Sequence, residues 1–384
     1  MTTQRTLDRA AYIIFIALIL LAPLVLQEFW LNRIAKFLVY GILGVAVSLC
    51  WGYGGILNLG QGLFFGAGAY MLAMSLKLAS ATSLQQGSDQ PVPDFMLWNA
   101  EPGSPTELCC INHGSFLWLP FQSQWFGVAM GVLMPVVLAA VLGTIVFRKR
   151  IAGVFVSVIT LALVLLVRLV IIDAQPVTNG FNGLTDLGTF TIGGLEFDPY
   201  SRATYYLVAA MLILVLVGAR LLVETRAGLI LQAIRDDQNR AQYLGFDVPV
   251  YQVFFFTVSA AISGIAGMLY VIVAEFASPT FMDLSFSITM VVWAALGGRS
   301  SLLGACIGAI LINIIAAGVS ETETFVEAWK AIIGLVFVLV VLYLPRGLAG
   351  FGQDLADALA NRLERRRAKP ATGVTLRQAG GGTP

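Results

Sequence analysis

Long apolar stretches recur along the chain and are separated by shorter polar segments. Each stretch approaches the length that a helix needs to cross a bilayer, about 20 residues. The pattern predicts about ten transmembrane helices, of which the eighth is short. The predicted spans are residues 11–26, 34–50, 55–79, 125–147, 151–172, 203–223, 250–274, 286–296, 302–319 and 328–344.

Composition supports the same interpretation. Hydrophobic residues make up 58% of the 384 residues, charged residues only 12%, and the mean hydropathy is +0.83. Soluble domains carry roughly 25% charged residues. We therefore predict an all-α, polytopic integral membrane protein. The first span begins near residue 11 and many others follow, so we interpret it as a true helix rather than a cleaved secretion signal.

Basic residues predict the orientation, because Lys and Arg gather on the cytoplasmic side of membrane proteins. With the N-terminus inside, only Arg33, Lys36, Lys77 and Arg202 fall outside. Both termini are then cytoplasmic, with an external loop over about 80–124 and a cytoplasmic loop over about 224–249. The residues predicted inside are Arg5, Arg9, Arg148, Lys149, Arg150, Arg226, Arg235, Arg240, Arg299, Arg346, Arg362, Arg365, Arg366 and Arg367.

The external loop offers little catalytic chemistry. Its adjacent Cys109 and Cys110 would form a strained disulfide with each other, so we expect free or intermolecularly paired thiols. His113 is the single histidine of the chain, which excludes a zinc site with two histidines and a histidine-based triad within the membrane. We predict no catalytic residue, no metal site and no cofactor, so the chain is not expected to be an enzyme.

The last part of the chain differs from the rest. Residues 1–350 form the predicted membrane domain, and residues 351–384 are polar, basic and rich in glycine. Such a segment buries too little apolar surface to fold alone. We expect a cytoplasmic tail that is partly disordered and whose arginines lie against the anionic lipid surface.

A polar, glycine-rich stretch inside the third span carries the candidate pathway. Asn58, Gly60, Gln61 and Gly62 place two amides and two glycines at membrane depth. Irregular backbone survives there only where protein or a water-filled cavity covers it. The residues are therefore predicted to line a translocation pathway. Close helix packing through Gly62 and Gly66 is the alternative, and the two roles are compatible.

No built-in energy source accompanies this pathway. No lysine has the Gly-Lys-Ser/Thr setting of a phosphate-binding loop, and the spans hold few of the carboxylates that ion-driven transporters bury. An external motor would need a cytoplasmic docking surface. In the loop near residue 240, Asp236 or Asp237 can cap the start of a helix of about two turns and Gly245 can close its end. Ala241 and Leu244 would share one face of it, although an ordinary solvated loop helix would look similar. The candidate coupling residues are Arg235, Asp236, Asp237, Ala241, Leu244 and Gly245.

Five segments of the chain resemble one family in the expected order. They are LNLGQGLFF at 57–65, NGLTD at 182–186, AIRDD at 233–237, VVWAALGGR at 291–299 and LPRGL at 344–348. The likeness is to permeases of the branched-chain amino acid and urea class of ABC importers. It implies a multi-pass protein of the bacterial inner membrane that works with two ABC ATPase subunits, a periplasmic solute-binding protein and a second permease, within membrane lipid and without nucleic acid.

Within that family the chain looks most like urea-type permeases that form heterodimers. Asn58 and Gln61 replace the usual Ser and His of that type, and Ser300 and Ser301 replace Gly-Thr. Urea is the first solute we consider, because amides and hydroxyls without fixed charge suit a small neutral molecule. Amino acids are the alternative solute. A stand-alone channel or secondary transporter is a further alternative of a different class.

The outer segment NGLTD is a candidate gate or contact for the binding protein. Asn182, Gly183, Thr185 and Asp186 carry this prediction. A tight glycine turn explains the same residues. Ser259, Ser263 and Asn313 are further polar residues that could line the path.

Overall fold

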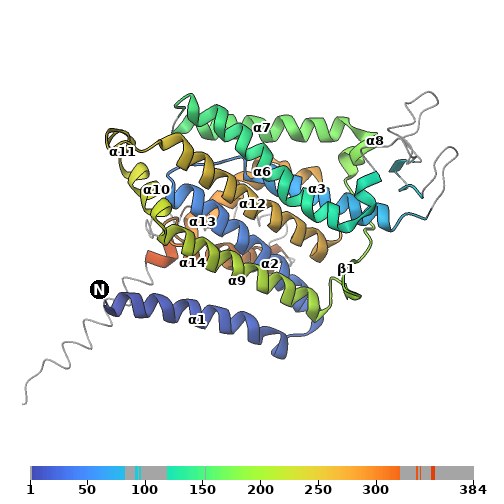
Figure 1. Ribbon diagram of the computed structural model, residues 1–384. Helices are drawn as coiled ribbons and strands as arrows, with labels where there is room; N and C mark the ends of the chain where they lie inside the picture. The colour runs from blue at the N-terminus through green and yellow to red at the C-terminus, as the bar shows by residue number, and fades with distance from the viewer. Residues whose placement is uncertain are drawn as a thin grey trace, which may run out of the picture.

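The computed structural model describes residues 2–82, 91–93, 95–96, 119–151, 153–320, 334–335, 338 and 347–350. Predictions for Cys109, Cys110, His113, most of the external loop, most of the span 328–344 and the tail 351–384 lie outside the described residues. The element labels follow Figure 1.

Helices dominate the described residues. Seven are long and apolar enough to cross a membrane, and two shorter apolar helices cover Arg9–Val25 and Leu284–Gly297. The all-α polytopic prediction is confirmed. The long elements are α1 (Thr2–Val25), α2 (Glu28–Val47), α3 (Gln61–Ala79), α6 (Gln124–Arg148), α7 (Val154–Asp173), α9 (Arg202–Glu224), α10 (Arg226–Asp236), α12 (Val248–Ala274), α13 (Leu284–Gly297) and α14 (Leu302–Ser320).

Short elements connect these helices. A π-helix, η1, continues α2 over Ser48–Tyr53, and the other short pieces are η2 (Leu119–Gln122), α8 (Gln175–Thr178), η3 (Gly180–Asn182), α11 (Gln238–Tyr243) and η4 (Pro279–Met282). The strands β1 (Phe190–Ile192) and β2 (Leu195–Phe197) pair antiparallel, with Phe190 opposite Phe197. Gly193 and Gly194 both have positive φ, as a two-residue hairpin turn requires. This hairpin was not predicted from the sequence.

The boundaries predicted for the second and third spans were wrong. The second span begins earlier, at Glu28, and continues through η1 to Tyr53. The third helix begins only at Gln61, so residues 54–60 are irregular rather than helical. Gly55, with φ of +68°, adopts a backbone conformation that ends a regular helix and that L side chains rarely adopt.

Three glycines let the central helices approach closely. A Cβ on Gly68 of α3 would overlap the backbone of Gly264 of α12, and a Cβ on Gly264 would meet the backbone of Gly131 of α6. Small residues of this kind allow tight packing in membranes, where apolar burial gives no advantage over lipid. These glycines join α3, α6 and α12, while the most buried of the long described helices, at the centre of the bundle, are α2, α3 and α12.

Outer helices surround this centre. In Figure 1, α1 lies at one edge of the bundle beside α9. The hydroxyl of Tyr205 in α9 donates a hydrogen bond to the carbonyl of Ile19 in α1 at 2.9 Å, and the guanidinium of Arg220 lies 4.4 Å from the ring of Tyr12. Both α1 and α7 expose large apolar side chains, as contact with lipid or another membrane helix requires.

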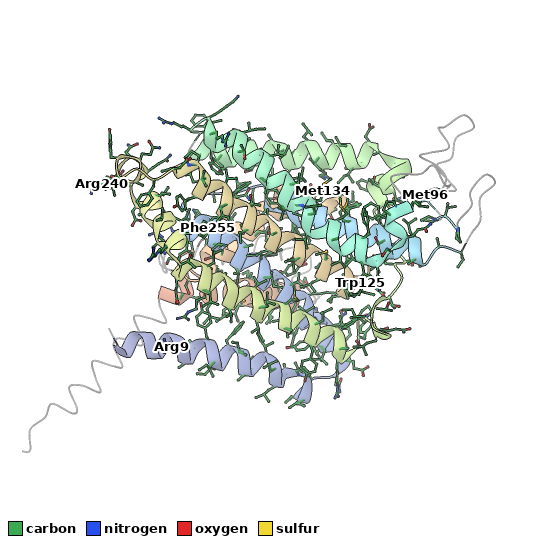
Figure 2. The ribbon with its side chains drawn as sticks, viewed as in Figure 1. Arg9, Met96, Trp125, Met134, Arg240 and Phe255 are labelled. Carbon is green, nitrogen blue, oxygen red and sulfur yellow. The ribbon has the colours of Figure 1, made fainter. Side chains whose placement is uncertain are left out.

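The two ends of the bundle carry different elements. Figure 1 shows α10, α11 and the N-terminus at one end, and α8 and β1 at the other. In Figure 2, Arg9 and Arg240 lie toward the first end, while Met96 and Trp125 lie toward the second. We refer to the end with Arg9 and Arg240 as the cytoplasmic end, following the predicted orientation.

Candidate transport pathway and coupling segment

The π-helix η1 packs tightly at the cytoplasmic end of α2. Gly52 lies so close to the carbonyl of Arg299 that a Cβ there would overlap it. The hydroxyl of Ser48 donates a hydrogen bond to the same carbonyl at 2.9 Å, and the guanidinium of Arg299 lies 5.4 Å from the Trp51 ring. Short π-helices are rare and frequently mark functional sites.

Residues 54–60 lead from η1 back into the membrane. Gln61, the first residue of α3, bonds to Ser259, which lies about three helical turns from Val248 at the cytoplasmic start of α12. At 1.5 Å per residue this depth is on the order of 16 Å. Helix α3 therefore begins well inside the bundle rather than level with the cytoplasmic start of α12. Discontinuous helices of this kind characterise transporter sites.

Gln61 joins α3 to α12. Its amide nitrogen Nε2 donates to the hydroxyl of Ser259 at 3.0 Å and to the hydroxyl of Ser263. Each hydroxyl in turn donates to a backbone carbonyl: Ser259 to Ala46 of α2 at 2.7 Å, and Ser263 to Ser259 at 3.1 Å. One amide therefore connects the beginning of α3 with both α12 and α2.

Asn58 completes this network. Its Nδ2 donates to Oε1 of Gln61 at 2.6 Å, and its Oδ1 accepts from the backbone N–H of Gly60 at 2.8 Å. The network of Asn58, Gln61, Ser259 and Ser263 is called the amide cluster below. It satisfies polar groups that would be costly to leave unpaired in a low-dielectric interior.

Helix α7 holds the irregular segment from the other side. The hydroxyl of Ser157 donates to the carbonyl of Leu57 at 2.7 Å, and the hydroxyl of Thr160 accepts from the N–H of Leu59 at 3.2 Å. These two residues were missed in the sequence analysis. Two hydroxyls three residues apart, within a long apolar helix, share one face and were the available signal.

The amide cluster is buried in this conformation. Gln61 has 0% and Asn58 3% of its surface exposed. A Cβ on Gly62 would meet Phe281, and one on Gly66 would meet Met282, so both glycines allow close packing, mainly against the short element η4 rather than against a second long helix. The pathway-lining role of Asn58, Gly60, Gln61 and Gly62 stays a prediction. Asn313 lies apart and bonds back to its own helix at Ala309.

The predicted coupling segment, residues 235–245, contains the end of α10 and the short helix α11. Arg235 and Asp236 end α10, and Asp237 caps α11 by accepting from the N–H of Arg240 at 3.1 Å. Gly245, with φ of +89°, closes the end of α11. The capping roles predicted for Asp237 and Gly245 are therefore confirmed, with α11 covering only Gln238–Tyr243.

The predicted shared face of Ala241 and Leu244 was wrong. Ala241 is 3% exposed and packs with Ile234 and Val248, whereas Leu244 is 76% exposed. The helix ends at Tyr243, so Leu244 begins the turn and points away from the face that Ala241 buries. Tyr243 is also 91% exposed. The outward apolar surface of this segment is therefore Tyr243 and Leu244.

Arg235 links the coupling segment to the helix break. Its Nη1 donates to the carbonyl of Gly52 in η1 at 2.7 Å, while Nε and Nη2 donate to Asp236 at 3.0 and 2.9 Å. A Cβ on Gly55 would press against the Arg235 side chain. The absence of a side chain at Gly55 thus leaves room for this contact.

The outer segment is fixed to the chain before η4. Leu184 and Ala277 exchange two backbone hydrogen bonds of 2.7 and 2.9 Å, and Gly183, with φ of +73°, fits closely against Ala277. Asn182, Thr185 and Asp186 remain exposed. The predicted glycine turn is confirmed, while the gate or binding-protein contact stays a prediction.

Charged groups within the described membrane region are few and mostly peripheral. Arg168 pairs with Asp283 at 3.2 Å, and Nζ of Lys77 donates to the carbonyl of Asp186 at 3.4 Å. Just beyond α12, partial burial raises the pKa of Glu275, and the nearby carboxylates of Asp198 and Asp186 raise it further. Among the described residues no group of His, Cys, Asp and Glu could hold a metal ion.

A bundle of membrane-length helices in which α3 starts well inside the bundle, with a capped helical segment exposed at one end, defines the class of membrane transport permeases. Residues 29–341 match the family model of the branched-chain amino acid transport system permease component. The chain therefore belongs to this family of ABC transporter permeases, which are transport subunits of the inner membrane and not enzymes.

Several permeases are similar to the chain. The high-affinity branched-chain amino acid permease LivM of Escherichia coli K12 is 26% identical over 364 residues, covering 86% of this chain and 74% of LivM. The probable permease LivH of Methanocaldococcus jannaschii is 27% identical, covering 59% and 76%. The ribose import permease RbsC of Haemophilus influenzae is 25% identical, covering 56% and 67%. No solved structure matches the chain.

Proposed function

We propose that the chain is the permease subunit of an ATP-driven importer that brings a small polar solute, most simply urea, from the periplasm to the cytoplasm. The observation that carries this proposal is the hydrogen bond from Arg235 of the coupling segment to Gly52 of the helix break. It joins the surface that a motor would contact to the segment that leads to the amide cluster.

The coupling segment is suited to receive force from an ATPase. Tyr243 and Leu244 project as an apolar surface, and the buried Ala241 ties α11 to α10 and α12 through Ile234 and Val248. A push on α11 would therefore move a packed unit rather than a loose loop. Arg235 would pass the displacement to η1, and residues 54–60 would shift relative to α7 and α12.

The chemistry of the amide cluster favours an uncharged solute. Its side chains are two amides and two hydroxyls, with hydrogen-bond donors and acceptors and no ionisable group. Opening the contact between α3 and α12 would exchange these internal hydrogen bonds for bonds to the solute. Urea offers the same amide groups, so such an exchange would leave few polar groups unpaired.

A branched-chain amino acid is the second candidate solute. Helix α3 starts well inside the bundle, with Gly60 at its N-cap and no side-chain cap. The positive end of a helix dipole favours a carboxylate, as in transporters with discontinuous helices. The names of the similar LivM and LivH proteins specify branched-chain amino acids, and the name of RbsC specifies ribose.

Partner subunits complete the proposal. We expect a second, different permease beside this chain, two ATPase subunits at the cytoplasmic end, and a solute-binding protein at the end where Asn182, Gly183, Thr185 and Asp186 lie. The family membership supports the ATPase and the binding protein as a class. The heterodimer, and the contact at the outer segment, rest on the resemblance to urea-type permeases.

The test is uptake of radiolabelled urea and leucine into cells that carry the chain with its co-encoded partners. A catalytically inactive ATPase serves as the control. Urea uptake that needs the active ATPase and is not inhibited by leucine would support the proposal. Leucine uptake with the same dependence would keep the importer and change the solute. Uptake that is unaffected by the inactive ATPase would contradict the importer and favour a channel or secondary transporter.

A further inference from the structure

A large groove opens at the cytoplasmic end between α6 and α12, beside the coupling segment. Its volume is about 830 Å³. We propose that this groove binds one anionic glycerophospholipid of the cytoplasmic leaflet. The lining of the groove includes Arg148, Arg150 and Asp247 at the mouth and Val250, Val253 and Phe254 on the wall.

The mouth of the groove is basic. Arg148 is the last residue of α6 and Arg150 lies on the turn after it. Both are exposed, and within the described part of the chain no ion pair is found for either. Asp247 lines the same groove, so the three charges sum to one positive charge. A phosphodiester with one negative charge complements this balance. Basic pockets between helices on the cytoplasmic side bind such head groups.

The backbone at Arg150 supports a specific role for its side chain. Arg150 has φ of +56° and follows α6 at the position where glycine normally ends a helix. The N–H of the next residue, Ile151, bonds to the carbonyl of Val146 at 3.2 Å, as this helix ending requires. An arginine is less favourable than glycine in this left-handed region, because its Cβ approaches the following carbonyl oxygen. Strain of this kind is a reason to look for function at the side chain.

The inner wall of the groove is apolar and reaches membrane depth. Val250, Val253 and Phe254 follow one another along α12, and Val250 and Phe254 are exposed. Thr257 lies roughly 14 Å along the helix from Val248. A free phosphate ion would not use such a wall, whereas an acyl chain would cover it. The groove thus offers basic groups at its mouth for a phosphate and an apolar wall for an acyl chain. The combination therefore favours a lipid over an inorganic anion.

The groove also touches the coupling segment. Gln242 of α11 and Gly245 of the turn after it belong to the lining. A lipid seated here would stabilise the position of α11 that this structure has. We therefore expect bound anionic lipid to change how strongly the loaded binding protein stimulates ATP hydrolysis. That second expectation depends on the proposed function, whereas lipid binding itself does not.

The test measures lipid retention by native mass spectrometry on the full-length chain, purified with its co-purifying subunits and titrated with phosphatidylglycerol. The double variant Arg148→Gln, Arg150→Gln is compared with Lys149→Gln, which changes a charge on the same turn outside the groove. Each arginine near the surface contributes about fivefold to binding, so the double variant is expected to bind about thirtyfold more weakly. Lys149→Gln is expected to lose about fivefold at most.

Titrations with other ligands distinguish an anionic lipid from the other possible occupants of the groove. Phosphatidylethanolamine and inorganic phosphate are titrated in the same way, and both are expected to bind more weakly than phosphatidylglycerol. Equal retention by the double variant, or displacement of lipid by inorganic phosphate, would overturn the proposal. So would crosslinking of a photoreactive residue at position 150 to an ATPase subunit instead of lipid. Because retention needs no transport, the result is independent of the uptake experiment.

Discussion

Replacing Arg235 should uncouple ATP hydrolysis from transport while leaving the protein assembled. The guanidinium donates to the Gly52 carbonyl at 2.7 Å and forms a fork on Asp236. A hydrogen bond from a charged donor contributes about 1.5–3 kcal/mol, and we take the lower value because the Arg235 side chain is 32% exposed. Arg235→Gln should then reduce the stimulation of ATPase activity by loaded binding protein about tenfold.

Two further variants make this prediction specific. Asp236→Asn removes an ion pair whose carboxylate is 69% exposed, and such surface pairs contribute about 0–1 kcal/mol. It should therefore retain most of the stimulation. Arg235→Lys can still reach the Gly52 carbonyl with one N–H but cannot form the fork, so an intermediate effect is expected.

The assay is ATP hydrolysis in proteoliposomes, with and without loaded binding protein, alongside the amount of ATPase that co-purifies with the chain. Normal stimulation in Arg235→Gln would refute the proposed link between the coupling segment and η1. Equal losses in Arg235→Gln and Asp236→Asn would show that the ion pair, rather than the bond to Gly52, is what matters. Loss of co-purifying ATPase would instead indicate a docking defect.

Three other changes should have defined effects. Gly68→Ala places a methyl group against the α12 backbone and should lower the free energy of unfolding by more than about 2 kcal/mol. Gly218→Ala has open space at its Cβ and should leave the free energy of unfolding unchanged or raise it by less than about 1 kcal/mol. Equal melting temperatures of the two variants would contradict the packing argument. Gln61→Leu leaves the Asn58 amide without its acceptor and should cost about 1–3 kcal/mol in thermal unfolding as well as lowering uptake, so unchanged values in both would exclude the amide cluster from structure and transport. Glu275→Gln should gain stability relative to the parent chain as pH rises from 4.5 toward neutrality, because a carboxyl with a raised pKa in the folded state destabilises that state as it ionises; melting curves with a constant difference across pH would disprove this.

Features that depend on composition along the chain could be predicted. The lengths of the apolar stretches predicted membrane-spanning helices. Local capping chemistry predicted that Asp237 precedes α11 and that Gly245 follows it. The polar glycine-rich stretch near Asn58 and Gln61 was recognised, because amides are conspicuous in an apolar span. These signals reside in neighbouring residues and need no knowledge of the tertiary structure.

Features that depend on contacts between distant residues could not be predicted. The bond from Arg235 to Gly52 spans 183 positions, and the contact between Gln61 and Ser259 spans 198. The late start of α3 at Gln61 follows from where α7 and α12 supply hydrogen-bond partners, which apolar length does not encode. Ala241 is buried and Leu244 is exposed because α11 ends at Tyr243, so Leu244 lies outside the helix that was predicted to include it.

The two hydroxyls of α7 have a consequence for how this helix can vary. Most of the surface of α7 faces outward and requires only an apolar side chain. Many exchanges among Val, Ile and Leu should therefore leave stability and uptake unchanged. Ser157 and Thr160 are different, because each supplies a backbone group of the irregular segment with its partner. A saturation library of α7 should thus show two positions that tolerate few substitutions in a helix that otherwise tolerates many. These two positions mark the face of α7 that contacts the irregular residues 54–60.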